Sequence, residues 1–212
     1  MANESAKIRF EIAEYVHGRA IDIGGGANKV FPHMIGVDRG QPADIVHETM
    51  FFPFFADESF DCVFSANILA LAEVPIDVLK EWFRLTNVGG YLVLYVPCFG
   101  LTPEGFRGVA FTGDSIITMM DRLDGDWDLV KSQERQENGE YGLLQVYQKL
   151  MPGLGCKHSW LDPQPEKMAC VVRPGAYGDA LWGGSVVSHL KEQGYHVTVL
   201  TGVAGEEVLR HD

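Results

Sequence analysis

The sequence has little positive charge, no long apolar run and no closely spaced cysteines. Its 212 residues include 17 Lys and Arg against 29 Asp and Glu, which gives a formal net charge of −12. A general nucleic-acid-binding protein needs a basic surface, so no nucleic-acid partner is expected. The longest apolar run, residues 91–101, is shorter than the roughly 20 residues that a membrane-spanning helix requires. No membrane span is expected either.

The four cysteines are far apart in the sequence and form no CxxC pair. They are Cys62, Cys98, Cys156 and Cys170. We therefore expect no disulfide framework and no metal site, and a reducing cytoplasm is the simplest location. Residues 1–15 contain five charged side chains, so no secretory signal peptide is expected at this end.

Helical and strand-like segments alternate over residues 4–96. Residues 4–16 have apolar side chains at helical spacing, and residues 75–85 begin with Pro75, which fits the first turn of a helix. Short apolar runs predict strands at residues 19–23, 34–37, 43–46, 60–65 and 91–96. This alternation predicts a parallel sheet with both faces covered.

The pattern changes after Pro97. A loop rich in Gly and Pro is expected at residues 98–111 and a helix at residues 112–123, followed by strands at residues 127–133 and 141–150. Asn138-Gly139 lies between these two strands and predicts an antiparallel hairpin. The expected fold is α/β and Rossmann-like, with a mostly parallel sheet of seven strands and a C-terminal antiparallel hairpin.

A second, smaller α/β unit is expected at the end of the sequence. Residues 1–150 form the first domain, and residues 151–167, rich in Gly and Pro, have the composition of a linker. Residues 168–212 then read as strand, glycine-rich turn, helix and strand. Such a unit is too small to bury a core of its own, so we interpret it as the truncated first part of another domain.

A glycine-rich turn is the first chemical signal. Residues 21–23 are a buried strand that runs into Gly24-Gly25-Gly26, where no Cβ keeps a ligand from the backbone. Asp38 follows Gly26 by twelve residues, at the end of the next strand, where a carboxylate can accept both hydroxyls of a ribose. The alternative is an ordinary strand-to-helix turn with Asp38 merely solvated.

The spacing separates two classes of nucleotide-like ligand. In a dinucleotide site the ribose-binding acid comes ~20 residues after the glycine fingerprint, and a third glycine is required. Here Asn28 stands near the position of that third glycine, and Pro32 interrupts the following segment. S-adenosylmethionine (SAM), which has no pyrophosphate, fits this shorter unit better than NAD does.

Three segments in order carry a resemblance to a known family. Residues 22–26 (DIGGG), 35–38 (IGVD) and 59–65 (SFDCVFS) resemble the class I SAM-dependent methyltransferases of the type 11 group, over roughly residues 8–150. The resemblance implies SAM as the cofactor. The cofactor-binding residues that it and the glycine turn indicate are Asp22, Gly24, Gly25, Gly26, Asp38, Glu48, Thr49, Met50 and Asn67.

The resemblance also implies a role for several of these positions. Gly24 and Gly26 would approach the methionine part of SAM, and Asp38 would hold the ribose. Glu48 would lie near the adenine amine, with Thr49 and Met50 flanking the ring. Asn67 would line the methyl-donor pocket. Independently of the resemblance, Asp22 sits directly before the glycine turn, where it could shape the turn and oppose the positive methionine end of the ligand.

One segment departs from the family pattern. Many relatives have Ser-x-His-x-Leu-Glu-His after the fourth strand, whereas residues 65–71 read SANILAL, with Asn67, Ala70 and Leu71 in place of the polar groups. The expected function is SAM-dependent methyl transfer to a small molecule or saccharide. The alternative is a catalytically degenerate binding or scaffold module, and an NAD-dependent oxidoreductase is a third, disfavoured hypothesis.

No catalytic base is assigned from the sequence. His47, Asp44 and Asp114 are conceivable bases. A base is needed only if the acceptor must lose a proton.

Residues 167–212 resemble a different family. The segment CVVRPGAYGDAL at 170–181, followed by HVTVLT at 196–201, resembles the opening of heptosyltransferase-type glycosyltransferases of family nine. The resemblance implies that Asp179 matches an acid proposed there as a general base. It also implies a role in polysaccharide or lipopolysaccharide modification, although the donor domain of that family is absent from this sequence.

Overall fold

The computed structural model describes most of the first three-quarters of the chain and shorter segments beyond it. The described residues are 4–26, 28–40, 42–48, 50–102, 106, 108–136, 141–158, 168–173, 189–192 and 196–201. The chain divides into two compact units, Met1–Leu161 and Asp162–Asp212. Thr49 and the predicted turn at Asn138-Gly139 lie outside the described residues.

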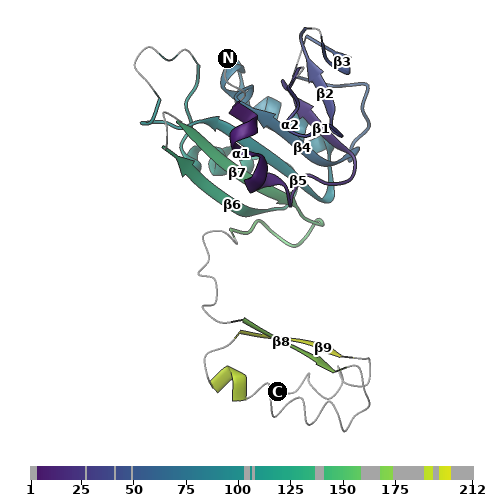
Figure 1. Cartoon of the computed structure of the whole chain (residues 1–212), viewed down its shortest axis with the longest axis vertical. Coiled ribbons are helices and arrows are strands. Elements are labelled where there is room, and N and C mark those ends of the chain that lie inside the picture. The colour runs from purple at the N-terminus through teal and green to yellow at the C-terminus, as the bar shows by residue number, and fades with distance from the viewer. Residues whose placement is uncertain are drawn as a thin grey trace. The chain divides into compact units, whose positions relative to one another are not determined.

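The first unit contains a seven-stranded sheet (Figure 1). Its strands are β1 (Ala20–Ile23), β2 (Ile35–Asp38), β3 (Ile45–Val46), β4 (Phe60–Ala66), β5 (Thr86–Pro97), β6 (Trp127–Arg135) and β7 (Gly142–Lys149). The spatial order is β3-β2-β1-β4-β5-β7-β6. The first five strands pair in parallel, and β7 is antiparallel to both β5 and β6. The predicted fold class is confirmed.

Helices cover both faces of this sheet. Helix α1 (Glu4–Ile12) buries Ile8 and Ile12 in a cluster with Phe64 of β4 and Val93 of β5. Helices α2 (Pro75–Leu85) and α3 (Gly113–Met120) pack into the other cluster, and a short 3-10 helix η1 (Leu69–Leu71) precedes α2. Figure 1 shows α1 in front of the sheet and α2 behind it. Two covered faces are what the alternating sequence pattern predicts.

Helix α2 forms as its sequence dictates. Pro75 occupies its first turn, where the missing N–H is not needed. Its apolar side chains recur every three or four residues, so one face is buried in the core. The buried residues are Val78, Leu79, Trp82, Phe83 and Leu85.

Strand β5 begins earlier than the sequence predicts. Helix α2 ends at Leu85 as predicted, but the strand starts at Thr86 rather than at residue 91, and Thr86 pairs with Phe60 of β4. The β4–β5 register shifts between Phe60 and Cys62, so the extra residues form a bulge. Gly89 has a φ of +81° in this bulge, a backbone conformation that glycine adopts without strain.

The second unit contains two described strands. Strand β8 (Met168–Arg173) pairs in parallel with β9 (His196–Thr201), as a strand–helix–strand connection requires. Residues 189–192 between them are helical. The predicted glycine-rich turn and most of the predicted helix fall outside the described residues.

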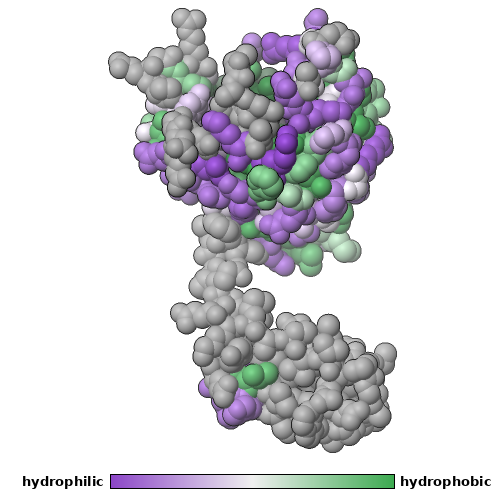
Figure 2. Space-filling model, in the orientation of Figure 1, coloured by the Kyte–Doolittle hydropathy of each residue, from purple (hydrophilic) through white to green (hydrophobic). Residues whose placement is uncertain are grey.

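The surface of the first unit is mixed in character. In the view of Figure 2, hydrophilic side chains cover much of it, and apolar ones lie scattered among them. Within the described ranges, every helix is too short or too polar to serve as a membrane-spanning segment.

Candidate functional site

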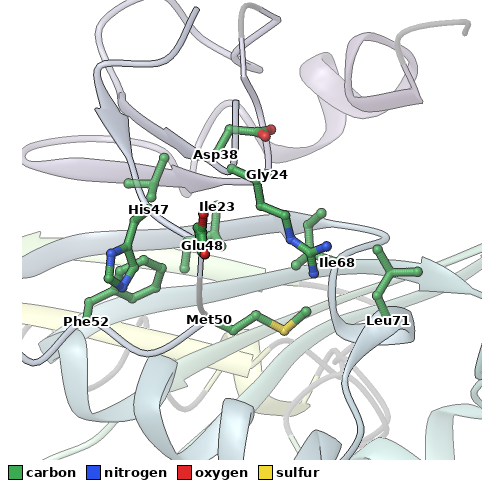
Figure 3. Close-up of a pocket in the computed structure, with 11 residues that line it drawn as sticks. Ile23, Gly24, Asp38, His47, Glu48, Met50, Phe52, Ile68 and Leu71 are labelled. Atoms are coloured by element: carbon green, nitrogen blue, oxygen red, sulfur yellow. The ribbon is translucent and has the colours of Figure 1, made fainter. Parts of the chain in front are cut away.

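A cavity of about 220 Å³ lies where β1 and β2 end. The strand order reverses between β1 and β4, with β2 and β3 on one side and β5 on the other. Ligands of open α/β sheets bind at such a switch point, beyond the carboxyl ends of the strands. The lining residues are Ile23, Gly24, Val37, Asp38, Arg39, His47, Glu48, Met50, Phe52, Ile68 and Leu71 (Figure 3).

The glycine turn follows β1 at one edge of this cavity. Gly24 donates its backbone N–H to the Val37 carbonyl at 2.7 Å and has a φ of +87°. A Cβ added at Gly24 would lie 2.2 Å from Cγ1 of Ile68, so the packed Ile68 side chain excludes any larger residue there. Ile68 therefore covers part of the turn, and Gly24 is the residue of the turn that still reaches the cavity.

Two carboxylates face the cavity from different segments. Asp38 ends β2, and a Cβ added at Gly26 would lie 3.1 Å from its Oδ2. Glu48 is exposed and comes from the segment after β3. Figure 3 shows both among the lining residues, with Asp38 in the upper part of the view and Glu48 near its middle. These two groups can accept hydrogen bonds from two different parts of one ligand.

Apolar side chains form the rest of the wall. Ile23 and Val37 come from the strand ends, Met50 and Phe52 from the loop after β3, and Ile68 from the segment after β4. An apolar slot with a few placed polar groups is typical of a small-molecule site.

Asp22 lies beneath the glycine turn and does not line the cavity. Its side chain is 1% exposed, and its Oδ2 accepts a hydrogen bond from the Val30 N–H at 2.7 Å. A Cβ at Gly25 would meet this carboxyl group at 2.6 Å. Burial raises the pKa of Asp22 to about 6. Asp22 thus shapes the turn from below and places a costly negative charge there.

Three other predicted cofactor-binding residues do not line the cavity. Gly25, Gly26 and Asn67 are not among its lining residues. Asn67 follows β4 with a φ of +61° and donates its backbone N–H to the Tyr95 carbonyl at 2.7 Å. The cavity brings together Gly24, Asp38, Glu48 and Met50, and their roles toward a ligand stay predictions.

Two polar lining residues were not predicted as ligand contacts. Arg39 directly follows Asp38, and this adjacency was the signal that could have found it. His47, considered only as a base, has its Nε2 2.8 Å from the Phe51 carbonyl oxygen and packs edge-on against Phe54. These contacts make His47 part of the wall.

The remaining base candidates lie outside the cavity lining. Asp44 accepts hydrogen bonds from Lys29 Nζ at 2.7 Å and from the Gly36 N–H at 2.8 Å. The bond from Lys29 lowers the pKa of Asp44, so this carboxylate serves an internal contact. Asp114 is in the first turn of α3. Among the residues that the structure describes, no group of three or more His, Cys, Asp and Glu could hold a metal ion.

A second groove of about 490 Å³ adjoins the cavity. It shares Arg39, Glu48, Met50 and Leu71 with the cavity and extends to the start of α2. The groove and the cavity are therefore neighbours on the surface of the first unit.

Comparisons with known proteins agree with this architecture. Residues 20–94 match the family described as Methyltransferase domain. No curated protein matches the chain.

Solved structures of similar fold cover most of the first unit. A SAM-dependent methyltransferase from Methanosarcina mazei is 18% identical, with a TM-score of 0.54 over 66% of this chain and 97% of that one. A SAM-dependent methyltransferase from Thermotoga maritima is 16% identical, with a TM-score of 0.51 over 68% and 88%. A cyclase is 12% identical, with a TM-score of 0.52 over 68% and 81%.

These likenesses define the class of fold. The first unit has the Rossmann-like fold of SAM-dependent methyltransferases, and the matched family and its structural neighbours indicate SAM as the cofactor. The cavity lies at the switch point that this fold uses for its ligand.

Proposed function

We propose that the first unit binds SAM in the switch-point cavity and transfers its methyl group to a small molecule or saccharide. One observation carries the proposal: Asp38 and Glu48 border a single apolar slot that opens onto Gly24. A nucleoside needs acceptors for its ribose hydroxyls and for its exocyclic amine, and an apolar surface for its base. The chemistry of the lining residues fits these needs.

Different lining residues would contact different parts of SAM. Asp38 would accept from the ribose hydroxyls and Glu48 from the adenine amine, while Met50 and Phe52 would pack on the ring. The negative charge of Asp22, below the turn, would favour the positive methionine end. When bound, SAM supplies a methyl group on a positively charged sulfur, so alignment of a nucleophile with it provides much of the rate.

The acceptor would lie beyond η1, beside the loop that follows β5. The Val109 N–H donates to the Ala70 carbonyl at 3.0 Å, which holds this loop against η1. Leu71, Phe99 and Val109 are 57%, 68% and 43% exposed. These side chains favour an acceptor with an apolar part, and an acceptor that is already nucleophilic needs no base from the protein.

The second unit bears on the biological setting. We propose that residues 151–167 act as a linker and that residues 168–212, which resemble the opening of a glycosyltransferase, point to a role in polysaccharide or lipopolysaccharide modification. Rapid proteolysis within residues 151–167 that leaves a stable fragment 1–150 would support these boundaries. Uniform resistance of that segment to proteases would contradict them.

The alternative is a binding or scaffold module that does not transfer methyl groups. Ala70 and Leu71 stand where many relatives have polar groups, and Ile68 covers part of the glycine turn. The cyclase of similar fold illustrates that this architecture does not fix the reaction.

Calorimetric titration with SAM and with NAD tests the proposal. The full chain should bind SAM with a micromolar Kd and should not bind NAD. Asp38→Ala should raise the Kd for SAM at least roughly tenfold, because it removes a charged acceptor. Asp124→Asn is the control, since Asp124 is an exposed acid that does not line the cavity. The Kd of this variant for SAM should equal that of the wild type.

The outcomes separate the hypotheses. Absence of SAM binding, or an Asp38→Ala variant that binds like the wild type, contradicts the proposal. SAM binding without methyl transfer to any thiol, amine, phenol or sugar in an acceptor panel favours the degenerate module. Binding of NAD in place of SAM would support the oxidoreductase.

A further inference from the structure

The loop that forms one wall of the cavity has no regular secondary structure. Between the end of β3 at Val46 and the start of β4 at Phe60, the described residues are in turns and irregular backbone. Met50 and Phe52, which line the cavity, belong to this loop. Strand pairing therefore does not fix the position of this wall, and other contacts must do so.

Three hydrogen bonds tie the loop to about one turn of helix α2. Trp82 Nε1 donates to the Met50 carbonyl at 3.2 Å. The Phe52 N–H donates to Glu81 Oε1 at 2.8 Å, and Arg84 Nη2 donates to the Phe52 carbonyl at 3.3 Å. The backbones of both Met50 and Phe52 are thus hydrogen-bonded to side chains of one helix.

Arg84 extends the same contact along the loop. Its Nη1 donates to the Phe55 carbonyl at 3.1 Å and to Asp57 Oδ1 at 2.6 Å. Its Nε and Nη2 each donate to a different oxygen of Glu81 at 2.8 Å, which is a bidentate pair. The Arg84 bond lowers the pKa of Glu81, so this carboxylate stays charged and keeps its bond to the loop.

Helix α2 is a firm base for these bonds. Trp82 and Phe83 are buried in the core cluster, together with Leu79 on the same face. The side chains of Glu81 and Arg84 are largely covered, in contrast to Lys80, which lies on the exposed side of the helix. The helix can therefore transmit its fixed position to the loop.

We propose, on the basis of the proposed function, that Glu81, Trp82 and Arg84 are positioning residues that set the adenine-binding wall. None of them lines the cavity. They act through the backbone of Met50 and Phe52, so their loss displaces the wall without removing any group that touches the ligand. The effect falls on recognition of the base, because that wall and Glu48 together face it.

Two variants and one control test this inference in the full chain. Trp82→Phe keeps a buried aromatic ring but removes the indole N–H that reaches Met50, together with the volume of the second ring. Arg84→Met removes the bonds to Phe52 and Phe55. Lys80→Met is the matched control, since the ion pair of Lys80 with Asp124 is exposed and 3.5 Å long. Calorimetry measures the Kd of S-adenosylhomocysteine and of its inosine analogue, in which oxygen replaces the adenine amine.

The positioning role predicts a change in discrimination as well as in affinity. Trp82→Phe should raise the Kd for S-adenosylhomocysteine roughly threefold and Arg84→Met roughly tenfold. In both, the wild-type preference for adenine over hypoxanthine should shrink. Lys80→Met should leave both values unchanged. All titrations are made at a temperature at which thermal melts show each variant fully folded.

A purely structural role would lower the melting temperature and leave both Kd values and their ratio at the wild-type level, which overturns the inference. If Arg84→Met does not fold, Trp82→Phe decides alone. A wild-type chain that binds neither ligand overturns the proposed function, and this inference with it. Wild-type binding that none of these variants alters overturns the positioning role only.

Discussion

The two ends of the cavity are built from different kinds of residue. The end at which we propose that the nucleoside binds, the nucleoside end, has the carboxylates of Asp38 and Glu48 and a wall that three side chains of α2 hold in place. The end at which we propose methyl transfer, the transfer end, has Ile68 packed on Gly24 and the exposed Leu71. The nucleoside end therefore has more polar groups and more supporting hydrogen bonds than the transfer end.

The largest expected effect comes from the junction between the two ends, at Gly24. Gly24→Ala places a Cβ 2.2 Å from Ile68 Cγ1 at a φ of +87°. Strain and overpacking should lower the free energy of unfolding by about 2–4 kcal/mol in urea titrations.

Two further variants sharpen the result at Gly24. Gly40→Ala is the control, since a Cβ there meets no atom within 4 Å, and it should change stability by less than about 0.5 kcal/mol. In a double-mutant cycle with Ile68→Ala, part of the Gly24→Ala loss should disappear. Independent, additive losses would show that Ile68 does not press on the turn.

The second-largest change in the free energy of unfolding is expected at Asp22, and it depends on pH. Burial raises the pKa of the Asp22 carboxyl group to about 6 in the folded protein, from an ordinary value of 3.8. The folded state then binds the proton more tightly than the unfolded state does. This contribution to stability is complete below about pH 4 and is lost as the pH rises through about 6.

Asp22→Asn removes that penalty while it keeps an oxygen for the Val30 N–H. At pH 7.5 the variant should be more stable than the wild type by on the order of 2–3 kcal/mol, since one pKa unit is worth about 1.4 kcal/mol. The difference should vanish near pH 4. Affinity for SAM should fall in the same variant. Urea unfolding at the two pH values, with SAM titration at pH 7.5, measures both, and a variant that is less stable at pH 7.5 would contradict the assignment.

The smallest effect is expected at the transfer end. Leu71→Ala truncates an exposed side chain, so the free energy of unfolding should change by less than about 0.5 kcal/mol. The Kd for S-adenosylhomocysteine should change by less than roughly threefold, because no polar contact is lost. Equal losses from Leu71→Ala and Asp38→Ala would remove the distinction between the two ends.

The sequence predicts the parts of this molecule that depend on local pattern. Strands β1, β2 and β4 are short apolar runs that end at turn residues, and α2 has both its proline start and its apolar period. Asp38 is predicted as a site residue because it lies at the end of a predicted strand. Each of these features depends on residues that are neighbours in the sequence, so the sequence alone can predict it.

Other parts depend on contacts between distant segments. The packing of Ile68 on Gly24 and the bonds from Trp82 and Arg84 to the loop after β3 join residues far apart in the chain. The early start of β5 depends on the pairing of Thr86 with Phe60. No local pattern encodes such contacts. The sequence predicts a role for Asp22 at the turn but not its bond to the Val30 N–H, and it does not predict the contact of Arg84 with the wall.

A crystal structure of the chain with S-adenosylhomocysteine would show whether the cavity binds the nucleoside as proposed. We predict that the ribose hydroxyls lie within hydrogen-bonding distance of Asp38, with the adenine amine at Glu48 and the adenine ring against Met50 and Phe52. A nucleoside bound elsewhere, or an Asp38 carboxylate turned away from a ligand in this cavity, would contradict it.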